Sequence, residues 1–363
     1  MITRKHIADL VRSYGDVTIG VLGSHSALEI MDGAKDEDMK TVVVCQRGRE
    51  TPYKRFGRLA DHMIVLRKFS DMVKRKIQDQ LRELNTILVP HRAFTAYIGY
   101  NSIENNLMIP IFGNRALLRA EERTVKRNQY YLLERARIKH PKIFKKPEDI
   151  DRAVIVKVQE AKRKMERAFF IASSYKDYRE KVQQRIDNGI IRKEDLAHAI
   201  IEEFAIGTYF NFNFFHSPLK QEVEFLGIER RLQTNLHDFV SMPARQQLDI
   251  DLQLQNIEIG HTPASIRESM LEKVFEIGDK FVKATKKEYP PGIIGPLSLQ
   301  SIVTVDLDIV VYDVSLRVPG NPIMATTSPY TKYYYGKTFG VGRRIAMEIK
   351  NAYNEERLAD IVT

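Results

Sequence analysis

The sequence has very little cysteine, no tryptophan and no long apolar run. One cysteine among 363 residues, Cys45, excludes an internal disulfide and a zinc cluster built on several thiolates. Cys45 lies in the apolar run TVVVC, where burial in a strand is the expected role. No apolar stretch reaches the length of a transmembrane helix, and the N-terminus lacks the apolar core of a signal peptide. We therefore expect a cytoplasmic protein that does not enter a membrane.

Several common catalytic patterns are also missing. The sequence has no GxxxxGK[ST] phosphate loop, no arrangement typical of a Ser–His–Asp triad, and no internal repeat. Hydrophobic residues make up 43% and charged residues 29%, which is the balance of a globular protein. The length is sufficient for two or three domains with substantial cores.

The positive charge is concentrated in one window. The formal net charge is +10, and residues 115–170 contain 17 Lys and Arg against 8 Asp and Glu. Such a window suits phosphate ligands or nucleic acid, but it is also typical of a solvated lid. It lacks interleaved aromatic residues and any known RNA- or DNA-binding motif. Nucleic-acid binding is therefore retained as an alternative hypothesis rather than the leading one.

Residues 1–122 alternate between strand and helix patterns. The apolar runs at residues 17–22, 41–45, 62–66, 86–90 and 109–112 predict strands, and the segments between them have helical spacing. This alternation is typical of an α/β domain with a parallel sheet. Ligands bind such sheets at the carboxyl ends of the strands, where residues 23–26 (GSHS) follow the first strand.

The rest of the chain divides into two further predicted domains. Residues 123–204 are basic and combine a strand (AVIVK), a helix near residues 175–189 and a second strand (HAIIEEF), which suits a mobile lid. Residues 205–363 combine long strands with helices at 265–283 and 341–352, which predicts an α+β domain.

Phosphoryl transfer needs cations for the phosphates and oxygen ligands for a metal ion. Lys157 ends the strand AVIVK, where its side chain points either into a cleft or to the surface. Glu202 and Glu203 end HAIIEEF, where they either contact a nucleoside or lie in solvent. His25 lies at the predicted ligand edge, either as a substrate contact or as a helix cap. No residue stands out as a catalytic acid or base.

A carboxylate in an apolar strand indicates a possible metal site. Asp313 lies in DLDIVVYDVSLR, and burying it there is costly unless a cation compensates its charge. A metal ion is one candidate cation, and Arg317 is the other. Gln300, at the end of GPLSLQ, would add a neutral oxygen ligand if the two strands are neighbours.

Longer strings resemble archaeal FAICAR synthetase, an ATP-grasp ligase of purine biosynthesis. They occur in the family's order from about residue 17 to the end of the chain: GSHSALEI, DGAKDE, PYKRF, VPHRAF, IPIFGN, PEDIDRAVIVK, PPGIIGPLSLQS and GRRIAMEIK. The resemblance implies an ATP-grasp fold with an N-terminal Rossmann-like domain. It also implies formylation of AICAR (5-aminoimidazole-4-carboxamide ribonucleotide) by formate and ATP, through formyl phosphate, in IMP biosynthesis. We also expect a homo-oligomer.

The resemblance assigns roles to the positions already singled out. His25 resembles the family's AICAR-contacting histidine, and Lys157 resembles its phosphate-binding lysine. Glu202 and Glu203 are similar to the nucleoside-binding segment. Gln300 and Asp313 resemble the ligands of Mg²⁺ or Mn²⁺, with Asp313 replacing the family's glutamate.

The sequence departs from the family where the phosphates of ATP would lie. The family has a glycine-rich loop after its AVIVK-type strand, whereas this chain reads VQEAKRKMERAFF. The segment contains no glycine or proline and is rich in helix formers, so we expect residues 158–170 to be helical or ordered away from the phosphates. A helix cannot wrap a triphosphate as a glycine loop does.

Four further departures lie at ligand-contacting positions. Ala93 replaces a serine, His261 an asparagine and Gln233 a glutamate, and PGNPIMATT replaces a glycine-rich stretch. They leave a second hypothesis beside the ligase, namely a nucleotide-binding relative with altered or lost activity.

Overall fold

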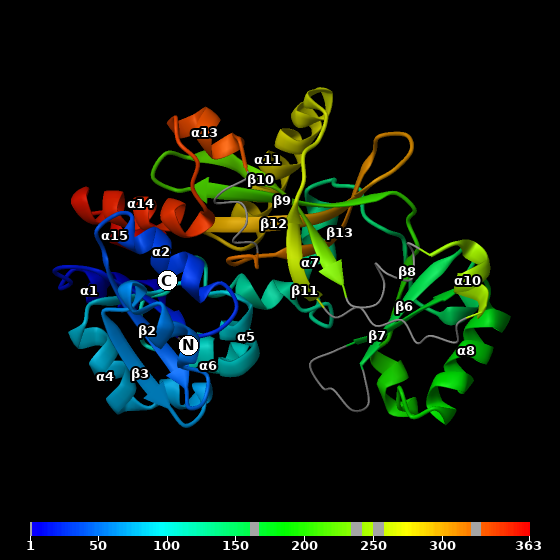
Figure 1. Ribbon diagram of the computed structural model, residues 1–363, viewed down its shortest axis with the longest axis horizontal. Coiled ribbons are helices and arrows are strands. Elements are labelled where there is room, and N and C mark those ends of the chain that lie inside the picture. Colours follow the sequence, from blue (N-terminus) through cyan, green and yellow to red (C-terminus); the bar gives the residue numbers. More distant parts are fainter. Residues whose placement is uncertain (1, 160–166, 234–241, 250–257, 321–327) are drawn as a thin grey trace.

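The computed structural model describes residues 2–159, 167–233, 242–249, 258–320 and 328–363. Within these ranges the chain forms three sheets with helices packed around them (Figure 1). None of the described helices combines the length and the apolar character needed to cross a membrane. The three sheets fall within the three predicted spans, and the domain boundaries themselves stay a prediction.

The N-terminal sheet is parallel, as its alternating pattern predicts. Its strand order is β3-β2-β1-β4. All five residues of β1 are buried because neighbouring elements cover both faces, which explains its unbroken apolar run. Cys45 is buried in β2 as expected. The strands are β1 (Thr18–Leu22), β2 (Lys40–Gln46), β3 (His62–Leu66) and β4 (Thr86–Leu88). The accompanying helices are α1 (Arg4–Val11), α2 (Ala27–Lys35), α3 (Thr51–Arg55), α4 (Arg75–Glu83), α5 (Arg92–Ile98) and α6 (Tyr100–Asn105).

The predicted strand at residues 109–112 is wrong. These residues make only single bridges, from Ile111 to Leu88 and from Phe112 to Val362. Pro110 has no backbone N–H to donate, so a continuous ladder is interrupted at the centre of the run.

The lid is a small antiparallel sheet with one long helix. Its order is β5-β8-β6-β7, so β6 and β8, which carry Lys157 and Glu202, lie side by side. The Ser174 side chain caps the helix by accepting a hydrogen bond from Asp177 N (3.2 Å). The elements are β5 (Ile143–Phe144), β6 (Val154–Gln159), β7 (Arg167–Ala172), α8 (Tyr175–Asp187) and β8 (Ile200–Glu203).

The expected helix at residues 158–170 is also wrong where the structure describes it. Residues 158–159 end β6 and residues 167–170 begin β7, and the two strands pair antiparallel from Val154–Ala172 to Gln159–Arg167. Strand pairing overrides the local helix propensity because it buries Val156, Val158 and Phe170 in the lid core. Residues 160–166, with Lys162, Arg163 and Lys164, lie outside the described residues.

The third sheet is antiparallel and lies between the other two parts in Figure 1. Its order is β11-β10-β9-β12-β13, and α7 and α11 contribute to its core. The elements are β9 (Thr208–Ser217), β10 (Glu222–Gln233), β11 (Glu258–Pro263), β12 (Gly295–Val303), β13 (Ile309–Ser315), α7 (Gln129–Arg135), α10 (Ala244–Asp249), α11 (Leu271–Glu288) and α13 (Tyr330–Tyr335).

The C-terminal helices return to the N-terminal sheet. α14 (Val341–Asn354) and α15 (Leu358–Ile361) add Ile345, Ile349 and Ile361 to the core of that domain. α14 packs directly on α2, and a Cβ at Gly33 would collide with the backbone of Gly342 and Arg343. This close approach of two helix backbones holds α2 beside the carboxyl edge of the parallel sheet.

Gly33→Ala should therefore destabilise the protein although alanine is the better helix former. We expect the loss from forcing α2 and α14 apart, about 1–3 kcal/mol or more, to exceed the gain of about 1 kcal/mol in helix propensity. Gly57→Ala is the matched control, because a Cβ there meets no neighbouring atom. Chemical denaturation of both variants measures the difference. Equal stabilities would contradict the proposed role of the helix contact.

Candidate ligand-binding site

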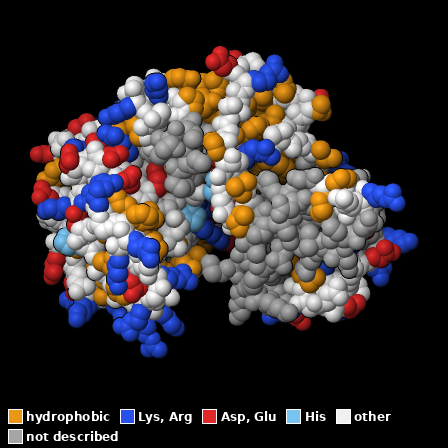
Figure 2. Space-filling view, viewed as in Figure 1, with side chains coloured by type: hydrophobic (Ala, Val, Ile, Leu, Met, Phe, Trp, Pro, Cys, Tyr) orange, Lys and Arg blue, Asp and Glu red, His pale blue; other side chains and the backbone are white. Residues whose placement is uncertain are grey.

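A hollow separates the N-terminal part from the lid. Figure 2 shows histidine and Lys or Arg side chains at the floor of this hollow, between the left and right halves of the view. The candidate residues approach it from the carboxyl edge of the parallel sheet, from the lid strands β6 and β8, and from the strands β10 to β13 of the third sheet.

The turn after β1 presents His25 in an unusual backbone conformation. The φ angle of His25 is +52°, a left-handed value that is uncommon for a residue with a side chain. Ser26 Oγ donates a hydrogen bond to Pro319 O (2.7 Å), so the single hydroxyl proton is already used. The contact between His25 Nδ1 and Ser26 Oγ (2.7 Å) therefore requires Nδ1–H as the donor. This leaves His25 Nε2 with a free lone pair, beside Gly320.

A second histidine lies parallel to the first. The rings of His25 and His91 are 5.7 Å apart with an interplanar angle of 4°. His91 Nε2 lies 3.0 Å from Leu22 O and must donate to it, so Nδ1 carries the lone pair. Desolvation and nearby positive charge lower the pKa of His25 to about 3, and burial lowers that of His91 to about 4. Both imidazoles are therefore neutral at physiological pH.

Arg317 supplies positive charge beside the two histidines. Its side chain is about 10% exposed and pairs with Glu121 (Nε to Oε1, 3.4 Å). The sequence-based alternative that Arg317 neutralises Asp313 by direct pairing is thus not what the structure shows, because Asp313 pairs with Arg123. Arg317 instead lies close enough to lower the pKa of His25 and of His91.

His261 is held between two carboxylates. Nδ1 lies 2.9 Å from Glu229 and Nε2 lies 2.9 Å from Glu258, so both ring nitrogens donate. Burial alone would lower the pKa of His261, but the two hydrogen bonds outweigh it and raise the pKa to about 9. Glu229 also accepts a hydrogen bond from Asn211 Nδ2 (2.6 Å). His261 is therefore an imidazolium whose donors are already occupied.

The lid contributes a buried ion pair. Lys157 Nζ lies 2.5 Å from Glu202, and both side chains are almost fully buried. Tyr130 donates a hydrogen bond to the other oxygen of Glu202, and Arg123 lies 3.7 Å from it. Lys157 also lies 6.0 Å from the ring of Tyr312. Lys157 and Glu202 are thus brought together at the junction between the lid and the third sheet.

Glu203 lies on the other face of β8. Its carboxylate pairs with Arg152 (3.1 Å) and accepts a hydrogen bond from the backbone N–H of Lys142 (3.2 Å). Successive residues of a strand point to opposite faces, so the structure separates Glu203 from Glu202. Among the predicted site residues, Glu203 is the one placed at the lid surface.

Gln300 and Asp313 are neighbours, as the predicted metal site requires. They are register partners across β12 and β13. Asp313 pairs with Arg123 (2.8 Å). Burial alone would raise the pKa of Asp313, but the charges of Arg123, Arg231 and Lys157 outweigh it and lower the pKa. Gln300 Oε1 is buried and has no hydrogen-bond partner among the described residues.

These two side chains suit a magnesium ion. A carboxylate and an orphaned amide oxygen are hard oxygen ligands, and Mg²⁺ commonly takes one or two protein ligands beside water and substrate phosphates. Within the described ranges, no group of three or more His, Cys, Asp or Glu side chains is placed to hold a metal by itself. A site that shares its ion with a nucleotide is consistent with both observations.

Sequence reasoning missed several residues of this network. Arg123, Tyr130 and Glu229 each contact a predicted site residue. No sequence pattern marks these three residues as part of the site, because each lies far along the chain from the residue that it contacts. His91 was visible in the string VPHRAF, directly after a predicted strand, and the topological rule that identified His25 applies to it equally.

The other departing positions are Ala93, Gln233 and the stretch PGNPIMATT. Ala93 is buried in α5, two residues after His91. Gln233 ends β10, and its side chain lies outside the described residues, as do residues 321–327 of the stretch PGNPIMATT.

Most cations of the basic window at residues 115–170 whose side chains the structure describes have ion-pair or hydrogen-bond partners. Arg115 is buried and donates to the backbone carbonyls of Ile103, Leu107, Ile109 and Thr363. Other cations of the window pair with carboxylates: Arg119 with Glu104, Arg127 with Glu288, Lys139 with Asp308, Lys142 with Asp151, and Arg152 with Glu203. This pairing weakens the case for a nucleic-acid surface there.

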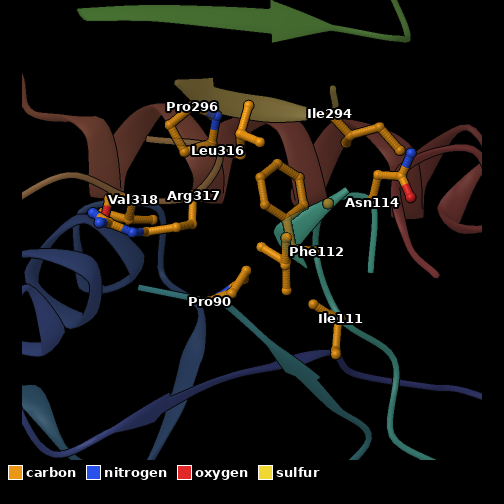
Figure 3. Close-up of a pocket in the computed structure, with 11 residues that line it drawn as sticks. Pro90, Ile111, Phe112, Asn114, Ile294, Pro296, Leu316, Arg317 and Val318 are labelled. Carbon is orange, nitrogen blue, oxygen red and sulfur yellow. The ribbon is translucent and has the colours of Figure 1, made fainter. Parts of the chain in front are cut away.

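A small cavity marks the junction between the N-terminal and third sheets. Its volume is about 10 Å³, enough for about one water molecule. Figure 3 shows Phe112 and Leu316 in its apolar lining, with the guanidinium of Arg317 extending to one side. The cavity is a packing gap beside the ligand site and is too small to hold a nucleotide.

The fold defines the chain as an ATP-grasp ligase. It matches the IMP biosynthesis protein PurP from Thermococcus kodakaraensis with a TM-score of 0.72, 25% identity, and coverage of 95% of this chain and 100% of that one. It also matches the ADP complex of purK, N5-carboxyaminoimidazole ribonucleotide synthetase, with a TM-score of 0.61 and 14% identity, covering 89% of this chain and 77% of that one. The second match supports the fold alone.

Sequence comparison identifies the family. Residues 19–144 match a protein of unknown function (DUF1246), and residues 177–363 match a domain of unknown function (DUF1297). The chain is 43% identical to 5-formaminoimidazole-4-carboxamide-1-(beta)-D-ribofuranosyl 5'-monophosphate synthetase of Methanopyrus kandleri, over 100% of both chains. It is 42% identical to that of Methanocaldococcus jannaschii, also over 100% of both. The chain belongs to this family, the FAICAR synthetases.

The charge of His261 should make stability depend on pH. A group whose folded pKa is raised stabilises the fold fully below its unfolded pKa of 6.5, and this contribution is lost as pH rises through about 9. The rise corresponds to about 3 kcal/mol. The stability difference between the wild type and His261→Asn should therefore shrink by about this amount between pH 6 and about 10. Denaturant titrations at several pH values measure it.

His62→Asn is the control for this experiment, because His62 is exposed and has no ion-pair partner among the described residues. A difference between wild type and His261→Asn that stays constant over the same pH range would contradict the imidazolium assignment.

Proposed function

We propose that this chain formylates the amine of AICAR with formate and ATP, giving FAICAR, ADP and phosphate. The observation that carries the proposal is full-length identity of 43% to a relative named for synthesis of this formylated product. The arrangement of the candidate residues supports it. Neutral histidines lie at the parallel-sheet edge, and Lys157, Gln300 and Asp313 lie at the junction of the lid and the third sheet.

The reaction would proceed through formyl phosphate. A formate oxygen attacks the γ-phosphorus of ATP and ADP leaves, after which the AICAR amine attacks the formyl carbon and phosphate leaves. Lys157 would hold the phosphates, and Glu202 would keep the Lys157 side chain in place through their 2.5 Å contact. Gln300 and Asp313 would hold Mg²⁺ or Mn²⁺, which supplies compensation for phosphate charge.

His25 would bind the imidazole substrate rather than its phosphate. Its Nε2 is a lone-pair acceptor in the neutral ring, which suits an N–H donor such as an amine or a carboxamide. A cationic histidine in its place would repel such a donor. The low pKa of His25 therefore fits the role that its position in the family implies.

A second candidate function is nucleotide binding without ligation. Both donors of His261 are used by Glu229 and Glu258, so His261 offers a substrate less than the family's asparagine does. The expected helix at residues 158–170, which was the stronger argument for lost activity, is wrong in its described part. We therefore place ligation first.

The deciding experiment measures ADP release in the presence of ATP, Mg²⁺, formate and AICAR. Release that requires both formate and AICAR, with FAICAR identified by mass spectrometry, is the expected result. Binding of ATP and AICAR by calorimetry without any turnover would favour the second function.

Asp313→Asn should weaken metal-dependent ATP binding. Loss of one charged ligand corresponds to a decrease in affinity of about tenfold or more, about 1.4 kcal/mol. Asp308→Asn is the matched control, because Asp308 flanks the same strand but pairs with the exposed Lys139. Calorimetry of ATP with and without Mg²⁺ makes the comparison. Equal affinities for the two variants would remove Asp313 from the metal site.

His25→Ala should reduce affinity for AICAR by about tenfold or more, as expected for a lost hydrogen bond in a desolvated site. ATP affinity and thermal stability should remain close to those of the wild type and of the exposed control His62→Ala. A variant that loses its folded structure instead would identify His25 as a structural cap.

A further inference from the structure

A second concentration of positive charge lies outside both the predicted lid and the site. Residues 46–76 contain 10 Lys and Arg against 3 Asp and Glu, a net charge of +7 in 31 residues. All ten of these cations are exposed, and four of them pair with carboxylates: Lys54, Arg58, Lys74 and Arg75. The other six are called the basic rim: Arg47, Arg49, Arg55, Arg67, Lys68 and Lys76. Except for Arg49, which bonds Tyr97, the rim side chains make no ion pair or hydrogen bond with another described residue.

The basic rim shares an edge with the candidate site. Arg47 directly follows β2 and Arg67 directly follows β3, and the backbone N–H of Arg47 donates to Leu66 O (2.8 Å). Because β1, β2 and β3 are parallel, their carboxyl ends lie at the same edge as the turn that contains His25. Figure 2 shows Lys and Arg side chains gathered on the lower left, below the hollow.

Positive charge continues from the rim towards the site. Arg49 donates to Tyr97 OH (3.0 Å) and lies 5.4 Å from its ring, which places Arg49 against α5. Arg92, the first residue of α5, is exposed and follows His91. Burial lowers the pKa of Arg317, and the nearby charge of Arg92 lowers it further. Cations therefore follow one another from the outer edge to the histidine pair.

We propose that the basic rim is a steering surface that attracts nucleotide polyanions and guides them to the candidate site. The inference rests on the proposed function, whose nucleotide substrates carry phosphate charge. A concentrated field of one sign beside a cleft raises association rates about 10- to 1,000-fold, and salt suppresses the effect. Exposed cations beside a site contribute little to bound-state affinity because solvent screens them. The rim thus acts on the rate of capture.

The rim serves small anions rather than a nucleic acid. Its members Arg47 and Arg67 lie at the sheet edge that carries His25, and Arg92 lies close enough to Arg317 to lower its pKa. A nucleic-acid surface would instead be expected to combine a backbone-tracking groove with aromatic stacking platforms.

The test compares two variants of equal charge. In the rim variant Arg47, Arg67, Lys68 and Lys76 become Gln. In the control variant Lys283, Lys287, Lys332 and Lys337 become Gln, four exposed cations on α11, on α13 and just after α13, without ion-pair partners among the described residues. Stopped-flow fluorescence with a fluorescent ATP analogue measures association and dissociation rates from about 20 mM to about 500 mM salt, that is, from weak to nearly complete screening.

We expect the rim variant to associate about tenfold more slowly than the wild type at low salt, with the rates converging at high salt. Dissociation rates should be unchanged, and the control variant should stay within about twofold of the wild type. Equal slowing of both variants would overturn the inference, because net charge rather than position would then matter.

Three other outcomes are informative. If the wild type binds the nucleotide at a rate that does not depend on salt, the steering role is wrong and the proposed function stands. If single-stranded RNA binds the wild type but not the rim variant, while nucleotide association is equal in both, the rim is a nucleic-acid surface and the inference is overturned. A wild type that binds no nucleotide at any salt concentration contradicts the proposed function itself.

Discussion

The arrangement of this site depends on one chain of buried and partly buried charges, from Lys157 through Glu202 and Arg123 to Asp313. It runs from the lid to the third sheet and contains two cations and two carboxylates. A charge removed from water is costly unless it is paired, and removing one partner leaves the other uncompensated. The lid therefore cannot separate from the third sheet here without exposing these groups to water or offering them new partners. A metal-bound nucleotide supplies both kinds of partner, anionic oxygens for the cations and a cation for Asp313.

The two sides of the candidate site differ in the charge of their polar groups. At the edge of the parallel sheet the histidines are kept neutral, and their lone pairs suit N–H donors. At the lid junction the polar groups are charged and suit phosphate and metal. One substrate is an imidazole with an amine and a carboxamide, and the other is a triphosphate, so the division follows the chemistry of the ligands. His25 stays unprotonated because partial desolvation and the positive charge of the neighbouring Arg317 both lower its pKa.

Sequence reasoning predicted the strands better than the contacts among the candidate site residues. The cost of burying Asp313 correctly indicated a compensating cation, but sequence proximity suggested Arg317, whereas the structure provides Arg123 from a distant segment. Alternation along HAIIEEF could have separated Glu202 from Glu203, since neighbouring strand residues face opposite sides. Helix propensity failed at residues 158–159 and 167–170 because pairing of β6 with β7 is a tertiary effect that propensity does not contain. A single sequence does not determine which distant segments form ion pairs or strand pairs with one another.

His261 shows how a substitution can remove hydrogen-bonding groups from a site, because the new side chain spends its own donors on protein partners. An asparagine at this position offers an amide donor and acceptor to a ligand, whereas His261 gives both of its N–H groups to Glu229 and Glu258. The imidazolium neutralises much of their charge. Glu229 is also held by Asn211, the register partner of Gln300. If the family's asparagine contacts the ligand, as the resemblance implies, the substitution exchanges that contact for a network that joins β9, β10 and β11. Such an exchange is compatible with catalysis if the lost hydrogen bond is replaced elsewhere at the substrate edge, where the buried lone pair of His91 lies behind the ring of His25.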